Sequence, residues 1–172
     1  NLNLEINEGE FFTFLGPSGC GKSTTLRALV GFLDPSQGRI EVNGKDVTKL
    51  EPEKRGIGIV FQSYALFPTM TVFDNIAFGL KIAKEKKSVI KERVEKLMEL
   101  VNIKGLGKRY PNQLSGGQRQ RVAFARALAP NPEILLLDEP FAAIDAKVRQ
   151  DLRNWLRETI DKVGITSIFV TH

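Results

Sequence analysis

A glycine-rich segment, GPSGCGKST at residues 16–24, constrains the fold of this chain more than any other feature. It fits the pattern GxxxxGK(S/T) and lies between an apolar run, EFFTFL, and a segment of helical character, KSTTLRALVGF. Glycines at this spacing allow backbone N–H groups to converge on one point, and the start of a helix adds its positive dipole end there. The segment therefore predicts a strand, a phosphate-binding loop and a helix, in that order.

The residues of this loop are expected to have separate tasks. Lys22 would reach the β- and γ-phosphates of a nucleotide, and the Ser23 hydroxyl would ligate Mg²⁺. Cys20 fills a variable position of the pattern, so we assign it no redox role. The predicted nucleotide-binding residues of the loop are Gly16, Pro17, Ser18, Gly19, Cys20, Gly21, Lys22, Ser23 and Thr24.

Strand and helix patterns alternate along the chain in a way that predicts an α/β fold. Strand candidates are NLEI, EFFTFL, GRIEVNG, RGIGIVF and SIFV, and the continuous apolar run ILLL at 134–137 is typical of a parallel strand covered on both faces. From residue 62 to 130 only helical patterns occur. We expect a P-loop core with a mostly parallel sheet and an N-terminal β part at 1–61 and 131–172, and a helical insertion at 62–130.

Composition narrows the class of protein further. A chain of 172 residues with 42% hydrophobic content can bury one core, and a single cysteine excludes a disulfide framework or a zinc cluster. The net charge of +5 leaves nucleic acid, an anionic membrane and a nucleotide open as ligands. The densest basic run, residues 81–96, also contains glutamates and apolar residues at helical spacing, which predicts the solvated face of an amphipathic helix. The chain begins without Met, and we expect it to be a piece of a longer protein.

Candidate catalytic residues follow the predicted strands. Asp138 and Glu139 come after the apolar run, and the ends of parallel strands gather at one edge, so we expect this pair beside the glycine loop. Asp138 would hold Mg²⁺, and Glu139 would act as general base on the attacking water. Gln62 and His172 follow two other strands and are candidates to contact the metal or water and a γ-phosphate, respectively. Taken alone, each of these residues also fits an ordinary polar role at a strand end.

The segment LSGGQRQR, residues 114–121, predicts a second helix start that can receive an anion. Ser115 suits the N-cap position, while Gly116 and Gly117 leave the N–H groups of the first turn open, and Arg119 and Arg121 add positive charge nearby. By itself the segment favours an ordinary capped helix with a flexible entry.

Five motifs occur in one order along the chain: GPSGCGKST, VFQ, LSGGQ, ILLLDEP and VTH. In this order and spacing they resemble the nucleotide-binding subunit of an ABC transporter over essentially the whole chain. The resemblance implies ATP hydrolysis with Mg²⁺ by two subunits packed head to tail, each ATP lying between the glycine loop of one and the LSGGQ of the other. It implies nucleotide contacts for Ser115, Gly116, Gly117 and Gln118, a switch role for Gln62, a general base at Glu139, an interface loop at Asp145 and a γ-phosphate sensor at His172.

The resemblance also implies partners. Segments such as SYALFPTMTVFDNIAFGL are similar to bacterial importer ATPases for sulfate, polyamines, ferric iron or phosphonate. A second copy of the subunit, transmembrane permease subunits contacted around residues 64–71 and, indirectly, a solute-binding protein are then expected, with the chain peripheral to the cytoplasmic side of the membrane. The family's adenine-stacking aromatic residue would precede residue 1. FAAIDA departs from the commoner SNLDA form of the interface loop but keeps Asp145.

Two other functions compete with this interpretation. The basic charge suits an ABC-type ATPase acting on nucleic acid or ribosomes, but no long coiled-coil or cysteine-rich insertion separates the two glycine motifs, and we expect no nucleic acid partner. A P-loop kinase for small molecules would leave LSGGQ and Glu139 without a role. An importer ATPase uses all five motifs.

Overall fold

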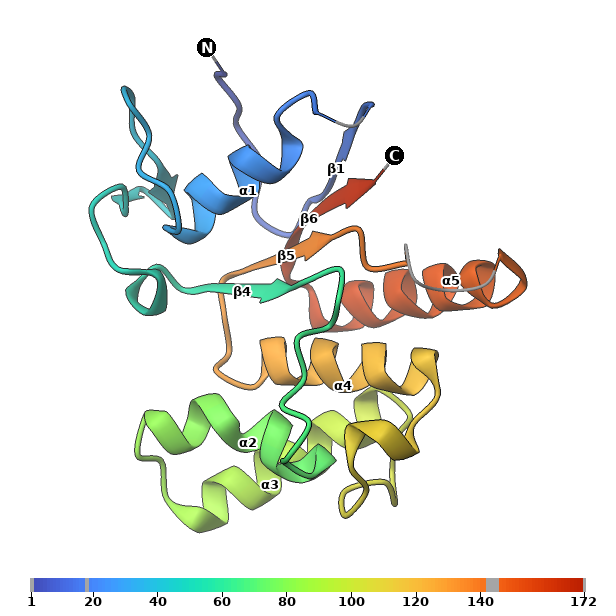
Figure 1. Ribbon diagram of the computed structural model, residues 1–172. Coiled ribbons are helices and arrows are strands. Elements are labelled where there is room, and N and C mark those ends of the chain that lie inside the picture. Colours follow the sequence, from blue (N-terminus) through green and yellow to red (C-terminus); the bar gives the residue numbers. More distant parts are fainter. Residues whose placement is uncertain (1, 18, 142–145, 172) are drawn as a thin grey trace.

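The computed structural model describes residues 2–17, 19–141 and 146–171. Among these residues, four strands pair in parallel in the order β1-β6-β5-β4 (Figure 1). The strands are β1 (Phe11–Leu15), β6 (Thr166–Thr171), β5 (Ile134–Asp138) and β4 (Ile57–Val60). The predicted α/β fold with a mostly parallel sheet is therefore confirmed.

Strand β5 has a continuous apolar run because both of its faces are covered by other residues. Leu136 packs in one cluster with Leu26 and Val30 of helix α1 (Lys22–Val30). Leu135 and Leu137 point to the other face, into the cluster formed with helices α4 (Gly116–Leu128) and α5 (Ala146–Val163). A strand buried on both sides needs apolar residues at successive positions, not alternating ones.

A layer of helices lies beyond α4. Helix α2 (Val72–Ile82) packs against α4, and helix α3 (Lys87–Leu100) packs against both (Figure 1). Two short 3₁₀ turns, η1 (Pro52–Lys54) and η2 (Pro111–Gln113), complete the described helical elements. The predicted limits of the insertion, 62 and 130, enclose α2, α3 and α4, although one apolar cluster joins these helices to the sheet. None of the helices in the described part of the chain is both long and apolar enough to cross a membrane.

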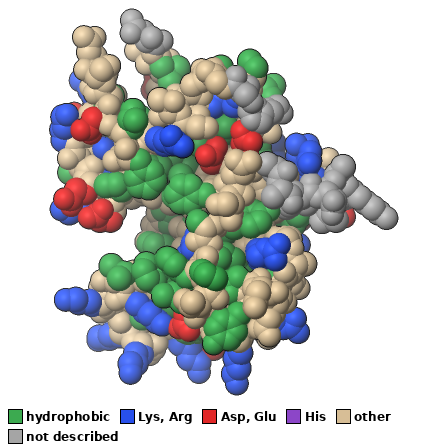
Figure 2. All heavy atoms as spheres, in the orientation of Figure 1, with side chains coloured by type: hydrophobic (Ala, Val, Ile, Leu, Met, Phe, Trp, Pro, Cys, Tyr) green, Lys and Arg blue, Asp and Glu red, His purple; other side chains and the backbone are tan. Residues whose placement is uncertain are grey.

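The basic run at 81–96 is divided between two helices, which corrects the expectation of one continuous helix. Helix α2 ends at Ile82 and α3 begins at Lys87, with Lys84 in the left-handed region at φ 57° between them. The inner residues of α3, such as Val94, are buried, and its lysines are exposed. Figure 2 shows Lys and Arg side chains along the lower edge of the molecule, where Figure 1 places α2 and α3. The predicted solvated basic face is present, carried by two helices and their turn.

The N-terminal β part differs from the prediction. Residues 3–6 form no strand in the described chain, and Leu2 and Leu4 are exposed, because a strand requires a paired neighbour and an apolar pattern alone does not supply one. GRIEVNG contributes a two-residue strand, β2 (Glu41–Val42), which pairs with β3 (Lys45–Asp46). Asn43 and Gly44 turn between them with φ of 49° and 72°, as a tight hairpin requires.

Arg55 joins helix α1 to the chain that enters β4. Its side chain is 3% exposed, and its Nη1 donates to the carbonyls of Ala28 and Leu29 at 2.8 and 3.0 Å. Its Nη2 and Nε donate to the carbonyls of Thr48 and Leu50, each at 2.8 Å. A buried cation surrounded by carbonyl oxygens at a helix C-terminus is favoured by the helix dipole. Arg55 therefore fixes the C-terminal end of the helix whose N-terminus carries the glycine loop.

Replacing Arg55 with Met should destabilise the fold strongly, because four backbone carbonyls, one buried and three partly buried, lose their donor. We expect a loss of at least about 3 kcal/mol in the free energy of unfolding, measured by urea denaturation. Arg39→Met is the matched control, since Arg39 pairs with Glu41 at an exposed position and should change stability by less than about 1 kcal/mol. Equal effects of the two substitutions would contradict the anchoring role.

Candidate functional site

The register of the sheet gathers the predicted site residues at one edge. The segments that follow β1, β4 and β5 all leave the sheet there, and β6 ends at the same edge with Thr171. His172 lies outside the described residues. The paired residues nearest this edge are Leu15 with Thr171, Phe14 and Asp138 with Val170, and Val60 with Leu137. The glycine loop, the carboxylates and the turn containing Gln62 therefore leave neighbouring positions of one edge.

The glycine loop has the backbone form that its sequence predicts. Gly19 and Gly21 have φ of 83° and 98°, which glycine adopts without strain. A Cβ on Gly16 would lie 3.0 Å from the sulfur of Cys20, so the loop folds closely on itself. Gly21 is the N-cap of α1, and within the described residues no side chain caps this helix start, which leaves its N–H groups directed at the loop. Ser18 lies outside the described residues.

Lys22 is held inside this loop. Its side chain is buried, and its Nζ donates to the carbonyl of Gly16 and, at 2.9 Å, to that of Pro17. The ammonium group is thus held by carbonyls of the glycine loop itself, in the segment predicted to receive a phosphate. Ser23 and Thr24, the next two residues, are exposed.

Asp138 and Glu139 form the acidic part of the edge. Partial burial raises the pKa of Asp138, the charge of Glu139 raises it further, and Arg27 acts in the opposite direction. Glu139 has a φ of 45°, and its N–H donates to the carbonyl of Val170 at 3.0 Å. This turn of the backbone ends the strand and leaves two carboxyl groups adjacent, an arrangement that favours a cation.

The oxygen atoms at this edge fit Mg²⁺ only together with a phosphate. Among the described residues, no three His, Cys, Asp or Glu side chains form a group that would hold a metal ion. Mg²⁺ commonly takes one or two protein oxygens and completes its shell with phosphate and water. The Asp138 carboxylate, the Ser23 hydroxyl and the amide oxygen of Gln62 are oxygen ligands of this type. Gln62 itself is exposed, in the turn after β4.

The predicted second anion site, residues 114–118 at the start of α4, is called the second cradle below, and the glycine loop is the first. It is a capped helix whose first turn is accessible. The N–H of Gln118 donates to Ser115 Oγ at 3.2 Å, and the N–H of Ser115 donates to Gln118 Oε1 at 2.9 Å, which makes a capping box. Ser115 is exposed. Figure 1 shows the start of α4 well apart from the glycine loop between β1 and α1. Asp145, the predicted interface residue, lies outside the described residues.

The two arginines that follow LSGGQ, Arg119 and Arg121, contact different parts of the chain. Arg119 Nη1 donates to the carbonyl of Leu114 at 2.7 Å, which keeps its charge at the helix start. Arg121 instead donates to the carbonyl of Val101 at 3.0 Å and lies over the Trp155 ring at 4.5 Å. The guanidinium group of Arg121 is therefore engaged between helices, whereas that of Arg119 is held at the start of α4.

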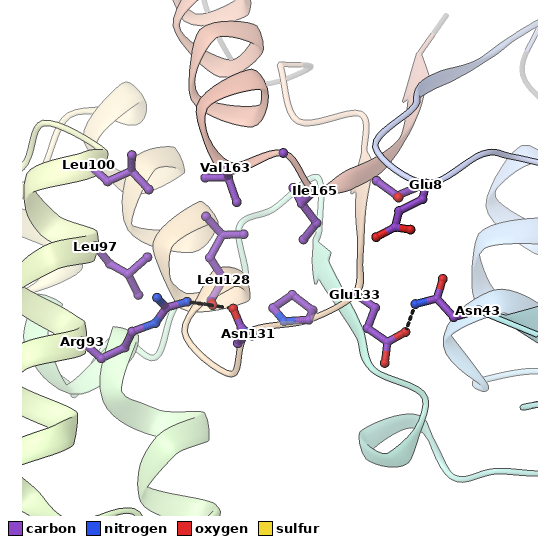
Figure 3. Close-up of a pocket in the computed structure, with 13 residues that line it drawn as sticks. Glu8, Asn43, Arg93, Leu97, Leu100, Leu128, Asn131, Glu133, Val163 and Ile165 are labelled. Atoms are coloured by element: carbon purple, nitrogen blue, oxygen red, sulfur yellow. Dashed lines mark hydrogen bonds between the residues drawn. The ribbon is translucent and has the colours of Figure 1, made fainter. Parts of the chain in front are cut away.

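Among the described residues, cavities adjoin the sheet at both of its edges. One of about 410 Å³ lies at the edge where β5 and β6 begin, at the opposite end of the strands from the predicted site (Figure 3). Its polar groups bind one another. Arg93 donates to the carbonyl of Leu128 and to the side chain of Asn131, and Asn43 donates to Glu133. The other, about 200 Å³, is lined by Glu139 and contains two residues that sequence reasoning missed, Arg149 and Arg153. Their i, i+4 spacing on α5 does not distinguish them from other surface arginines, so no sequence signal could have identified them.

Known proteins are similar to this chain in sequence and in fold. The family described as ABC transporter matches residues 1–142. The chain is 59% identical over 172 residues to the sulfate/thiosulfate import ATP-binding protein CysA of Synechocystis, covering 100% of this chain and 48% of the relative. It is 56% identical over 171 residues to a probable protein of the same name from Chlorella vulgaris, covering 99% of this chain and 72% of the relative. The chain thus spans about half the length of the Synechocystis relative.

A solved structure agrees with these relatives. It is described as a dimeric post-hydrolysis state of the ATP-binding cassette MJ0796 bound to ADP and Pi, and it superposes with a TM-score of 0.83 at 36% identity, covering 100% of this chain and 78% of that one. The sequence match over residues 1–142 and the shared fold lead to one conclusion. The chain belongs to the ABC transporter family.

Proposed function

We propose that this chain binds and hydrolyses ATP with Mg²⁺ and powers solute import through partner membrane subunits. The observation that carries the proposal is the sheet register, which brings the glycine loop and the Asp138–Glu139 pair to one edge. The relatives named for sulfate and thiosulfate import and the neighbour bound to ADP and Pi support the same chemistry. Membrane permease subunits, and a solute-binding protein indirectly, would complete the transporter, with the chain peripheral to the cytoplasmic side of the membrane.

The roles in binding follow from charge and position. The N–H groups of the glycine loop and of the start of α1 would surround the phosphates, and the Lys22 ammonium group would turn from the carbonyls of Gly16 and Pro17 toward the β- and γ-phosphates. Ser23, Gln62 and Asp138 would hold Mg²⁺. The ion would offset the charge of the phosphates and of the adjacent carboxyl groups.

Glu139 would accept the proton of the attacking water as the water oxygen bonds to the γ-phosphorus and the bond to the leaving ADP oxygen breaks. Its place directly after Asp138, with its backbone turned by a φ of 45°, keeps it next to the metal ligand at the same edge. Gln62 and His172 would orient the water and the γ-phosphate.

The second cradle would serve a partner's nucleotide. The Ser115 hydroxyl accepts a hydrogen bond from the Gln118 N–H but retains its own O–H to donate to a phosphate. One chain carries two glycine cradles and one acidic pair, and the cradles lie apart (Figure 1). In a head-to-tail dimer, with Asp145 at the interface, the LSGGQ of each copy would complete the ATP site formed by the glycine loop of the other copy.

Action on nucleic acid or ribosomes is less favoured. The basic surface of α2 and α3 is partly neutralised by ion pairs, such as Lys81 with Asp74 and Lys96 with Glu92 at 2.6 Å each. A mixed-sign helix face is typical of ordinary solvated surface. We therefore propose no nucleic acid partner.

Glu139→Gln in the full-length protein should bind ATP and accumulate the ATP-bound dimer, while phosphate release falls about 10²- to 10⁴-fold, because the general base is lost. Gel filtration and a phosphate-release assay test this. Glu133→Gln is the control, since Glu133 lies where β5 begins, at the opposite edge, and should leave turnover unchanged. Full turnover of Glu139→Gln would exclude the assigned base.

Ser115→Arg should abolish dimer formation and ATP hydrolysis while the monomer binds ATP almost as before, because the added cation and bulk block the partner-facing cradle. Nucleotide binding by fluorescence and dimer formation by light scattering separate the two effects. Ser88→Arg, also an exposed serine near the start of a helix, should leave both unchanged. Loss of ATP binding by the Ser115→Arg monomer would argue against a partner's site.

Asp138→Asn should raise the unfolding temperature at pH 7 by a few degrees while removing Mg²⁺-dependent hydrolysis. The pKa of Asp138 is raised in the folded chain, so its contribution to stability is full below the ordinary aspartate pKa and is lost as pH rises through the folded value. The gain from Asn should therefore vanish in acid, as thermal unfolding at several pH values would reveal. A lower unfolding temperature at pH 7 would contradict this account.

A further inference from the structure

One side chain, Arg126 of α4, ties the segment that follows Gln62 to the helix that begins at LSGGQ. Its Nη1 donates to the carbonyl of Ala65 at 2.7 Å, and its Nη2 donates to the carbonyl of Tyr64 at 2.9 Å. Its guanidinium group also lies over the ring of Phe67, 5.3 Å from the ring centre. A planar cation with two donors thus holds two successive peptide groups at once.

The backbone that Arg126 holds is strained. Tyr64 and Ala65 have φ of 61° and 46°, in the left-handed region that residues with a Cβ seldom adopt. Such a conformation persists only where surrounding contacts determine it, and strained positions of this kind cluster at functional sites. Burial of the Tyr64 ring, which is 6% exposed, and the two bonds from Arg126 are the contacts that do so here.

The environment of Arg126 strengthens these bonds. Burial lowers the pKa of its guanidinium group, although arginine remains charged at any ordinary pH. A desolvated cation gains more from carbonyl oxygens than an exposed one, because water screens it less. Arg126 is partly buried, and its two carbonyl bonds together with the Phe67 ring favour a single position of the segment.

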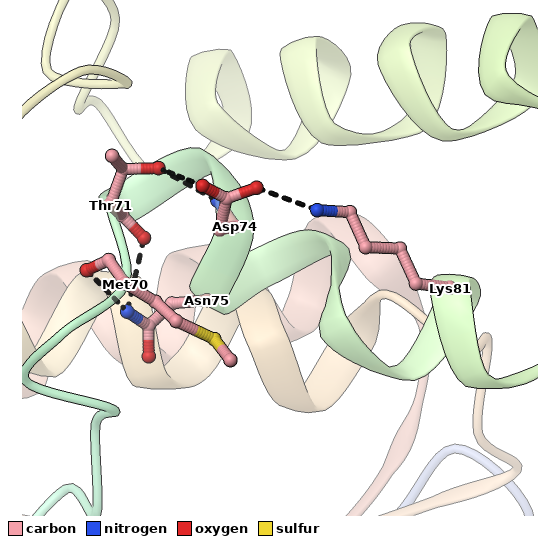
Figure 4. Close-up of polar contacts among 5 residues, drawn as sticks. All are labelled: Met70, Thr71, Asp74, Asn75 and Lys81. Carbon is pink, nitrogen blue, oxygen red and sulfur yellow. Dashed lines mark hydrogen bonds and ion pairs between the residues drawn. The ribbon is translucent and has the colours of Figure 1, made fainter.

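The far end of the segment is fixed separately. Asn75 of α2 is fully buried, and its Nδ2 donates to the carbonyls of Met70 and Thr71 at 3.1 and 3.0 Å (Figure 4). Its Nδ2 also donates to the carbonyl of Phe67 at 3.1 Å, and its Oδ1 accepts from the Phe67 N–H at 2.9 Å. Asn75 therefore holds Phe67, Met70 and Thr71 against the start of α2. Gln62 and Ser63, which are exposed, lie between β4 and the tie at Arg126.

We infer that Arg126 is a positioning residue that makes Gln62 and the LSGGQ cradle respond to one another. Ser115 and Arg126 lie on one continuous helix, about 16 Å apart along its axis at 1.5 Å per residue. A shift of α4 is thereby carried to the backbone two residues beyond Gln62, and a shift of Gln62 is carried back to the cradle. The inference rests on the proposed function, in which Gln62 contacts the metal or water.

Arg121 offers a matched control on the same helix. It too donates to a backbone carbonyl and lies over an aromatic ring, and burial lowers its pKa as well. Its carbonyl belongs to Val101, at the end of α3, away from the segment after Gln62. Arg121→Met and Arg126→Met therefore remove similar interactions, and only the second removes the tie.

The test is a double-mutant cycle in the full-length protein. Arg126→Met should lower kcat for ATP hydrolysis roughly 3- to 30-fold with little change in KM, and Gln62→Ala should then add almost nothing, because the position of Gln62 is already lost. Arg121→Met and Gln62→Ala should combine multiplicatively. Hydrogen exchange over residues 61–66 should quicken in Arg126→Met and not in Arg121→Met, which reports the tie without relying on activity.

The outcomes separate this inference from the proposed function. If Gln62→Ala alone leaves kcat unchanged, the role proposed for Gln62 fails. If Gln62→Ala lowers kcat but its effect multiplies with that of Arg126→Met, Arg126 only stabilises the fold and the inference is wrong. Lysine at position 126 can reach one carbonyl but cannot bridge two. Arg126→Lys should therefore give a kcat and an exchange rate between those of the unchanged protein and of Arg126→Met. If Arg126→Met does not fold, Arg126→Lys supplies the comparison.

Discussion

The parallel pairing of β5 between β4 and β6 is the constraint on which the rest of the structure depends. A strand buried on both faces must carry apolar residues throughout, so its polar residues can stand only where it leaves the sheet. Asp138 and Glu139 stand there, and the register aligns that end with the ends of β1 and β4. The requirement to bury Leu135, Leu136 and Leu137 thus leaves polar residues to the ends of the strand, and the proposed site lies at one of these ends.

Sequence reasoning worked where a local pattern and a long-range requirement agree. The glycine loop has a backbone form that few residue types permit, and the run 134–137 has one plausible environment, so both were predictable. Prediction from the sequence was wrong where the local structure depends on contacts with other parts of the chain. Residues 3–6 look like a strand but have no paired strand in the described chain, and the basic run at 81–96 contains a turn that helical periodicity does not reveal.

The two interpretations of LSGGQ, capped helix and anion site, are compatible. The capping box uses the oxygen of Ser115 as an acceptor and leaves its hydroxyl hydrogen and the glycine N–H groups available. A helix start that is already rigid also presents its dipole in a fixed direction, which lowers the entropy lost when an anion binds. The observed cap is therefore compatible with the proposed phosphate contact, and the sequence pattern alone does not distinguish the two roles.

Helix α4 illustrates what sequence alone cannot assign. Arg119, Arg121 and Arg126 are chemically identical, yet one stays at the helix start, one joins α3 to α5 and one holds the strained segment after β4. Their tasks are set by which carbonyls the fold brings within reach. A strained turn at Tyr64 and Ala65 would relax without a neighbour to hold it, so the strain and the arginine explain each other. A signal passed between Gln62 and LSGGQ then requires no loose hinge, only a turn that keeps its form while α4 moves.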